Sequence, residues 1–391
     1  MSALTELDKI LALLEKKKPE TQKCDVKKFD FSEAKNSSIL DVAWGRKPQR
    51  IPVFLHRQAG RYMEEFRAIR QKHEFFECCQ KPELCSEITL QPIEAFDLDA
   101  AIIFSDILVI CQVLGFEVEM QKEIGPVIKN LLEPSRKAVE ALRHLKEQRD
   151  VRKELGYVYE GIKATLSKLK GRVPLIGFVG GPWTLMSYVI APHGDRECQN
   201  AKKWLCKYPD LVDDVLDIFA EAVTEHLIGQ AQAGAQLLEI FESSAGYLSP
   251  PMFDRYLVPR LRTIYTRVRS SIDPKIPIIM FPRGAHFCLS SIIDIGFEVV
   301  ALDTTMSRTE ALKQSEGRVS LQGNLDPCIL YGSDQDIEKA VFAMLDEFRV
   351  KQNNKSKLIV NLGHGMLPDM EPRAVRALLK AVRKYEQEMC L

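Results

Sequence analysis

The sequence lacks any long uninterrupted run of apolar residues. A membrane-spanning helix needs roughly 18 or more, and no run in the 391 residues reaches that length, so no membrane span is predicted. Net charge is absent as well, because Lys and Arg total 54 and Asp and Glu also total 54. This balance argues against a broad surface for nucleic acid or anionic membranes and leaves room only for a local basic site.

Paired cysteine and histidine motifs are also missing. The ten cysteines contain no C-x-x-C spacing and no secretory signal precedes them, which indicates free thiols in a reducing compartment. The acidic N-terminus with no early arginine does not fit a mitochondrial presequence. No H-x-H, H-E-x-x-H, Walker or G-x-G-x-x-G motif occurs. The sequence therefore predicts no metal site and no bound cofactor.

What the chain does contain is an alternation of short apolar runs and helical stretches. The runs are continuously apolar, which is typical of parallel strands buried on both faces. They cover 51–56, 100–105, 173–179, 236–241, 276–281, 298–303, 318–322 and 357–362, and helical periodicity marks 210–232, 335–348 and 371–388. Eight strands with eight crossovers predict an α/β fold, a (β/α)8 TIM-type barrel in a single domain. The alternative, a doubly wound sheet, would need a glycine-rich fingerprint after its first strand.

The first 33 residues differ from this pattern. Leu4, Leu7, Leu11 and Leu14 recur at helical spacing and predict an amphipathic helix over 3–17, followed by a polar linker. We therefore expect an N-terminal extension over 1–33 and a catalytic barrel domain over 34–391. Two roles stay open for the helix, which either docks on its own domain or binds a partner.

A barrel carries its active site at the carboxyl ends of its strands. Nearly every predicted strand here ends in polar residues or glycine. The ends are His56-Arg57, Ser105-Asp106, Gly180-Gly181-Pro182, Glu242-Ser243, Pro282-Arg283, Asp303-Thr304, Gly323-Asn324 and Gly363-His364. Loops favour such residues in any protein, but the recurrence of single ionisable groups favours a shared polar mouth.

The end of the first run is the most informative. Arg57 and Arg61 lie four residues apart with Ala59 and Gly60 between them, which suits a ligand with several carboxylates or phosphates. The alternative is a pair of surface arginines bound to Glu64 and Glu65.

Other strand ends supply further candidates. Asp106 follows an apolar run and suits a base or an acceptor for N–H donors, or else a cap on the next helix. His364 lies between glycines and either binds a ligand or is structural. Tyr188 is expected on a helix, reaching either the mouth or the core. Ser243 lacks a G-x-S-x-G elbow and is not expected to be a hydrolase nucleophile.

Six segments together resemble the uroporphyrinogen decarboxylase family. They are PVFLHRQAGRY (52–62), FSDIL (104–108), GFVGGPWTLM (177–186), FES (241–243), LQGNLDP (321–327) and NLGHG (361–365). They occur in the family order, and the match runs in register from Asn36 to Leu379, leaving out only the N-terminal extension. The resemblance implies a distorted (β/α)8 barrel that is cytosolic, homodimeric and free of cofactors. It would remove four acetate carboxyl groups from uroporphyrinogen in haem biosynthesis.

The resemblance also assigns site residues. Asp106 and Arg57 would be catalytic, with Asp106 holding the central pyrrole N–H groups. The substrate-binding set would be Arg57, Ala59, Arg61, Arg70, Asp106, Tyr188, Ser243 and His364. The sequence departs from the family pattern at several positions, including His56 in place of Met and residues 190–194 in place of a glycine-rich lid. Two alternatives are a zinc- and corrinoid-linked methyltransferase on the same barrel, and an inactive tetrapyrrole-binding protein.

Overall fold

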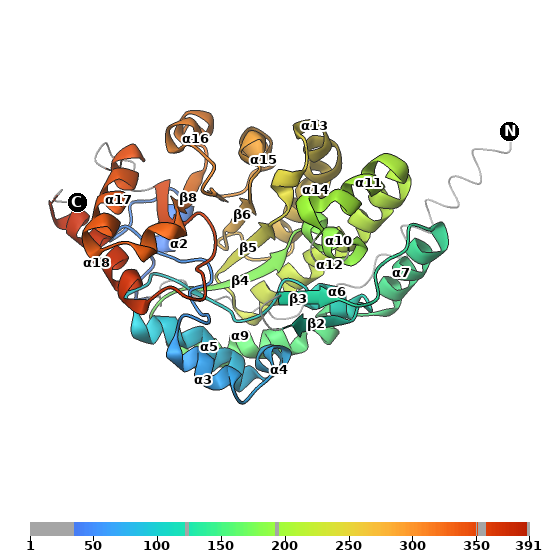
Figure 1. Cartoon of the computed structure of the whole chain (residues 1–391), viewed down its shortest axis with the longest axis horizontal. Coiled ribbons are helices and arrows are strands. Elements are labelled where there is room, and N and C mark those ends of the chain that lie inside the picture. The colour runs from blue at the N-terminus through green and yellow to red at the C-terminus, as the bar shows by residue number, and fades with distance from the viewer. Residues whose placement is uncertain (1–34, 122–124, 192–194, 349, 351–356, 389–391) are drawn as a thin grey trace. The chain divides into compact units, whose positions relative to one another are not determined.

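The computed structural model describes residues 35–121, 125–191, 195–348, 350 and 357–388 (Figure 1). These residues belong to one compact unit, Phe31–Leu391. The predicted helix over 3–17 and the linker after it lie outside the described residues, so the N-terminal extension stays a prediction.

A curled sheet of seven parallel strands forms the centre of this unit (Figure 1). Its order is β1 (Ala101–Ile102), β4 (Leu175–Gly180), β5 (Leu237–Glu242), β6 (Ile278–Pro282), β7 (Val299–Ala301), β8 (Ser320–Leu325) and β9 (Leu358–Leu362). Each strand pairs in parallel with its neighbour, and the chain runs through helical segments between them. The α/β class and seven of the eight predicted strands are confirmed.

The prediction of a regular strand over 51–56 is wrong. Val53 makes only an isolated parallel bridge to Val360 in β9, where the N–H of Phe54 donates to Val360 O over 3.0 Å. On its other side, Val53 O accepts the N–H of Asp99 at 2.9 Å. A regular strand does not form here because two N–H groups are missing from the hydrogen bonds of the sheet. Pro52 has no N–H, and the N–H of Val53 donates instead to Asp99 Oδ2 at 2.7 Å. An irregular segment therefore links the two edges of the sheet.

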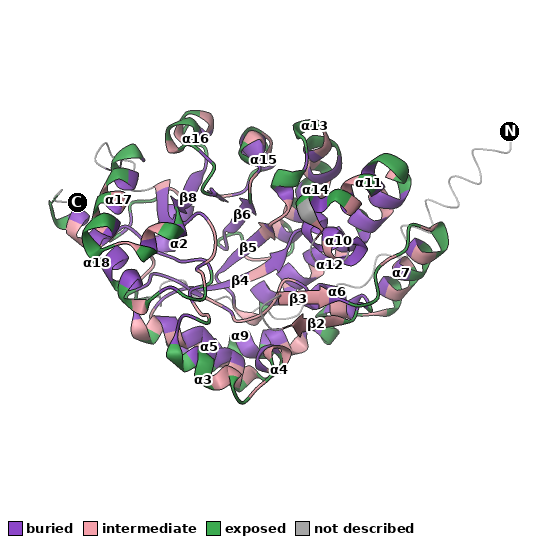
Figure 2. Cartoon of the chain, viewed as in Figure 1, coloured by how far each residue is buried: buried purple, intermediate pink, exposed green. Residues whose placement is uncertain are grey.

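The core has two layers separated by the sheet. The inner layer lies within the curl, where alternate strand residues such as Ile176, Leu237 and Ile359 are fully buried. Helix α2 (Ser38–Ala43) contributes Ile39 to the same cluster. It closes the amino-terminal end of the curl, where Ser320 Oγ of β8 donates to a carbonyl of α2. The open end of the sheet is therefore the carboxyl end of the strands. Figure 2 shows that the strands are mostly buried and that the surrounding helices carry most of the exposed residues.

The outer layer lies between the sheet and the surrounding helices. The predicted helices over 210–232, 335–348 and 371–388 are present as α12 (Pro209–Ala233), α17 (Asp334–Glu347) and α18 (Pro372–Glu388). The remaining helices of four or more residues, apart from short 3-10 and π turns, are α3 (Glu64–Arg70), α4 (Phe75–Gln80), α5 (Pro82–Ala95), α6 (Val109–Val113), α7 (Arg136–Gln148), α8 (Val151–Glu154), α9 (Gly156–Leu169), α10 (Pro182–Ile190), α11 (Gln199–Lys207), α14 (Val258–Arg269), α15 (Leu289–Ile295) and α16 (Arg308–Ser315). Among the described residues, no helix combines the length and apolarity needed to cross a membrane.

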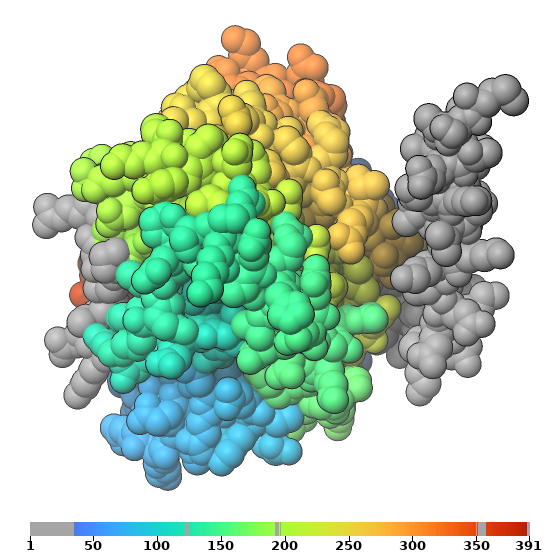
Figure 3. Space-filling model, turned by 90° about the vertical axis from the view of Figure 1, so that its right-hand side faces the viewer, coloured from blue at the N-terminus to red at the C-terminus, as the bar shows by residue number. Residues whose placement is uncertain are grey.

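The two longest connections hold extra elements, as expected. The one between β1 and β4 contains α6 to α9 and an antiparallel hairpin, β2 (Val118–Gln121) with β3 (Gly125–Ile128), which the sequence analysis did not predict. Figure 3 shows this connection (teal) covering one side of the molecule, with the segment around α3 and α4 (blue) below it. Eight cysteines lie in the described residues and all are free thiols, six of them buried.

Candidate functional site

The turn after the first apolar run places Arg57 at the carboxyl end of the sheet. Arg57 adopts a left-handed backbone with φ of 58°, and the N–H of Gln58 closes the turn on Leu55 O at 3.1 Å. Its stem lies against Gly365, where a Cβ would come within 2.4 Å of Cδ of Arg57. Glycine at 365 therefore makes room for the arginine. Neither Arg57 nor Arg61 forms the ion pair with Glu64 or Glu65 that the alternative reading required.

Asp106 lies in the loop between β1 and α6. Its Oδ1 accepts the N–H of Leu108 at 2.8 Å, and no described residue donates to Oδ2. One carboxylate oxygen is thus held within its own loop and the other is available to a ligand, while Leu108, not Asp106, is the N-cap residue of α6. Burial raises the pKa of the Asp106 carboxyl, while the Leu108 hydrogen bond and the positive charge of Arg57 oppose that rise.

Tyr188 is carried to the site by α10, whose position depends on Glu242 at the end of β5. The fully buried Glu242 carboxyl accepts the N–H groups of Trp183 and Thr184 at 2.8 and 3.0 Å and the Thr184 hydroxyl at 2.7 Å. A negative group at a helix N-terminus is favourable. Gly181 is required next to it, because a Cβ there would lie 2.2 Å from Glu242 Oε1.

Arg57, Asp106 and Tyr188 influence one another's ionisation. Burial of the guanidinium is the main cause that lowers the pKa of Arg57, although the residue as a whole is exposed to solvent. Tyr188 and Asp106 raise that pKa, whereas the cations Arg283 and Arg61 lower it further. Burial raises the pKa of Tyr188, the charge of Asp106 adds to the rise and Arg57 opposes it. The structure therefore brings Arg57, which follows the irregular segment 51–56, into one electrostatic unit with groups that follow β1, β4 and β6.

The other predicted residues lie around this unit with fewer contacts. Ser243 directly follows β5 and is half-buried. His364 follows β9, and its Nδ1 lies 3.0 Å from Gly365 O, next to the glycine that supports Arg57. Ala59 is partly buried against the outer core within the same turn as Arg57.

Arg70 is the predicted residue that the structure does not bring to this unit. On α3, its guanidinium donates to His73 O and lies 5.6 Å from the ring centre of Phe75. Its positive charge acts on the nearby thiols of Cys78 and Cys79. Asp106 also raises the pKa of Cys79, whereas Arg70 is not among the main charges that act on Arg57.

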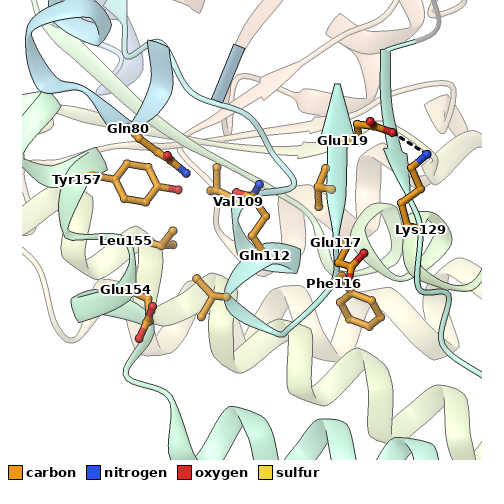
Figure 4. Close-up of a pocket in the computed structure, with 12 residues that line it drawn as sticks. Gln80, Val109, Gln112, Phe116, Glu117, Glu119, Lys129, Glu154, Leu155 and Tyr157 are labelled. Atoms are coloured by element: carbon orange, nitrogen blue, oxygen red, sulfur yellow. Dashed lines mark ion pairs between the residues drawn. The ribbon is translucent and has the colours of Figure 1, made fainter. Parts of the chain in front are cut away.

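A cavity of about 720 Å³ also lies behind the Asp106 loop (Figure 4). Gln112 on α6, Tyr157 on α9 and three glutamates line it, and its single lysine, Lys129, pairs with Glu119 at 2.6 Å. An acidic lining repels carboxylates, so this cavity does not suit the polyanion expected at the arginines. No three His, Cys, Asp or Glu side chains among the described residues are arranged to hold a metal ion.

Sequence reasoning missed two residues of the site. Glu242 is predicted only as a strand end, because nothing in the neighbouring sequence shows that it caps a helix through Thr184, 58 residues earlier. Arg283 was also seen as a strand end and given no role. The signal that identifies Arg283 is its influence on Arg57, which only the folded chain reveals.

The chain is similar to known proteins over most of its length. The sequence model of the family described as uroporphyrinogen decarboxylase (URO-D) matches residues 34–385. Uroporphyrinogen decarboxylase of Ovis aries is 44% identical over 361 residues, covering 91% of this chain and 96% of that protein. The one from Salinibacter ruber is 40% identical and covers 92% and 98%. A solved methyltransferase from Methanosarcina mazei shares the fold, with a TM-score of 0.71, 22% identity and coverage of 90% and 98%. The chain belongs to the uroporphyrinogen decarboxylase family.

Proposed function

We propose that this chain decarboxylates the four acetate side chains of uroporphyrinogen III, giving coproporphyrinogen III and CO2 in haem biosynthesis. The observation that carries the proposal is the grouping of Arg57, Asp106 and Tyr188 at the carboxyl end of the sheet. Cations there suit a ligand with many carboxylates. A partly buried carboxylate among them suits the N–H groups at the centre of a tetrapyrrole.

The chemistry of each step sets what the residues must do. Loss of CO2 from an acetate leaves an electron pair on carbon that needs a sink. Protonation of the pyrrole ring supplies that sink as a cationic intermediate, so no external cofactor is required. The Asp106 carboxylate stabilises the cation and accepts hydrogen bonds from the pyrrole N–H groups through its unengaged Oδ2.

The arginines hold the substrate while this happens. Arg57 and Arg61 bind carboxylates at the rim, Tyr188, Ser243 and His364 bind others, and Ala59 offers backbone contact. Each decarboxylation replaces CO2 by one proton, so each acetate requires a proton from the site. Arg57 and a water held by Asp106 are the two candidate donors.

The decisive assay is anaerobic incubation of the purified chain with uroporphyrinogen III, followed by oxidation and counting of the carboxyl groups on the products. Four-carboxyl product together with released CO2 supports the proposal. Porphyrinogen binding without CO2 release indicates a binding protein instead. Methyl transfer that depends on added zinc indicates the methyltransferase alternative.

The location, the oligomeric state and the role of the N-terminal residues are proposed from the resemblance to the family. We place the enzyme in the cytosol as a homodimer, with residues 1–33 as a helical extension of a single (β/α)8 barrel domain, and with Arg70 in the substrate-binding set. Light scattering that finds only a monomer would contradict the dimer.

A further inference from the structure

Arg283 stands directly after β6, on a loop that is fixed from both sides. Its N–H donates to Glu242 O at 3.1 Å, and its carbonyl accepts the N–H of Gly246 at 2.9 Å. A Cβ on Gly246 would lie 2.7 Å from the backbone of Gly284, so the loops after β5 and β6 touch through their backbones. This contact, together with the register of Glu242 with Pro282, places Arg283 beside Ser243.

The guanidinium of Arg283 is exposed and has no carboxylate within ion-pair distance among the described residues. Many other arginines of the barrel form ion pairs, although Arg57, Arg61 and Arg267 do not within the part of the chain that the structure describes. Arg260, for example, lies 2.9 Å from Asp213 and 2.8 Å from Asp217. A cation on a rigid loop with no anion of its own is available to an anion from solution.

The two loops that carry Arg283 and Arg57 lie far apart around the sheet. In the order from β1 to β9, β6 is the middle strand, and the segment that carries Arg57 joins the two edges. Arg283 nevertheless has a larger effect on the pKa of Arg57 than the neighbouring Arg61 has. The two residues therefore stand on opposite sides of the open end of the sheet, and the effect of Arg283 on the pKa of Arg57 agrees with this placement.

Two positive charges that face each other repel unless an anion lies between them. Carboxylates on opposite edges of a macrocycle would remove that repulsion and bind both cations. Guanidinium is suited to this task because its planar fork donates two hydrogen bonds to one carboxylate.

We propose that Arg283 binds a peripheral carboxylate of the substrate, together with Ser243, on the wall of the mouth opposite Arg57 and Arg61. The inference rests on the proposed decarboxylation and extends it by naming the second wall. The macrocycle is then held by cations at two opposed edges, with Asp106 beneath its centre.

The test compares Arg283→Gln with Arg283→Lys. A charge-assisted contact of this kind gives roughly a tenfold change in affinity. We expect Arg283→Gln to raise KM for uroporphyrinogen III about tenfold with kcat changed less than about twofold, and Arg283→Lys to recover most of the loss. The control is Arg267→Gln, which removes the same charge from the exposed outer face of α14 and should leave KM unchanged.

A binding measurement separates failure of the proposed function from failure of the role given to Arg283. Titration of each variant with coproporphyrin III, followed by fluorescence, reports binding without turnover, and Arg283→Gln should bind about tenfold more weakly with an unchanged melting temperature. Wild-type protein without decarboxylase activity would defeat the proposed function, while the titration would still test Arg283. Equal binding and equal KM in Arg283→Gln and wild type would overturn the role of Arg283, as would an equal loss in Arg267→Gln.

Discussion

Nε2 of His56 lies 3.0 Å from Oε1 of Glu239 in the interior of the curled sheet. Both side chains are buried, Glu239 completely. Gln322 Nε2 lies 3.2 Å from the same imidazole nitrogen and 3.3 Å from the same carboxylate oxygen. A proton on Nε2 lets both His56 and Gln322 donate to Glu239, whereas a proton on Nδ1 alone would break the shorter contact.

This buried pair supports the residue that precedes Arg57. The N–H of His56 donates to Asn361 Oδ1 at 3.0 Å, and its carbonyl accepts the N–H of Met366 at 3.1 Å. With side chain, N–H and carbonyl all fixed, His56 holds the chain at the start of the left-handed turn. A left-handed non-glycine residue is unfavourable by about 1 kcal/mol and persists where its surroundings constrain it.

The first prediction concerns that pair. His56→Met leaves the Glu239 charge buried without its imidazole partner, and the free energy of unfolding should fall by about 3 kcal/mol or more. The double variant with Glu239→Gln removes the charge as well and should be more stable than His56→Met alone. Denaturant unfolding of the four proteins measures the coupling between the two sites.

Simple additivity of the two substitutions would contradict a direct interaction. The same variant tests whether His56 tunes the pH response of the arginine wall. An unchanged pH profile of kcat/KM in His56→Met would rule that role out and leave only support of the Arg57 turn.

The second prediction concerns the aspartate. Asp106→Asn keeps the shape of the side chain and an oxygen that can accept the Leu108 N–H, but it removes the negative charge. Turnover should therefore fall by about a thousandfold or more, while coproporphyrin binding is retained in part. Asp150→Asn, at the cap of α8, is the matched control and should keep full turnover. Turnover that survives in Asp106→Asn would defeat the catalytic role given to this residue.

The third prediction follows from the buried acid that caps α10. Burial raises the pKa of Glu242 to about 7 from its usual 4.5, against the three hydrogen bonds that favour the anion. The folded chain therefore binds this proton more tightly than the unfolded chain. The contribution to stability is complete below about pH 4.5 and is lost as pH rises to about 7, on the order of 1.4 kcal/mol per pH unit at most.

Glu242→Gln cannot ionise, so the difference in unfolding free energy between wild type and this variant should shrink as pH rises through that window. Glu140→Gln, on the exposed face of α7, serves as the control for the loss of one carboxyl group at the surface. A difference for Glu242→Gln that stays constant from pH 4.5 to 7 would show that the carboxyl does not titrate there.

The sequence predicts a strand or helix correctly where the residues that determine it are neighbours in the chain. Continuous apolar runs such as 236–241 predicted seven strands, and helical periodicity over 210–232 agreed with α12 to within one residue at each end. The run 51–56 has the same composition, yet the loss of the Pro52 donor and the diversion of the Val53 N–H to Asp99 remove it from the ladder. That diversion joins residues 46 positions apart, which no local pattern contains.

The residues of the site also differ in whether the local sequence identifies them. Arg57, Asp106 and Tyr188 were identified because their flanking motifs are distinctive, and the fold then brought them together. Arg283 needed the fold, since its relation to Arg57 crosses the open end of the sheet. Arg70 shows another limit, because its contacts with His73 O and the Phe75 ring hold it on its own segment and its place in the substrate-binding set stays a prediction.

The last prediction uses the glycine beneath Arg57. A Cβ at position 365 would lie 2.4 Å from Cδ, 2.6 Å from Cγ and 2.8 Å from Nε of Arg57, so Gly365→Ala must displace that side chain. Because the displaced atoms belong to a flexible stem, the melting temperature should change little. The guanidinium, however, loses its place, and kcat/KM should fall by about tenfold or more.

Gly156→Ala provides the control at the first residue of α9, where a Cβ would meet no atom within 4 Å. It should keep wild-type kcat/KM. The double variant Arg57→Lys with Gly365→Ala tests whether the glycine acts through Arg57, because lysine has no forked guanidinium to be displaced. If the glycine acts only through Arg57, the alanine should cost far less in the Arg57→Lys background than in wild type, whereas equal losses in the two backgrounds would mean that Gly365 serves the loop rather than the arginine.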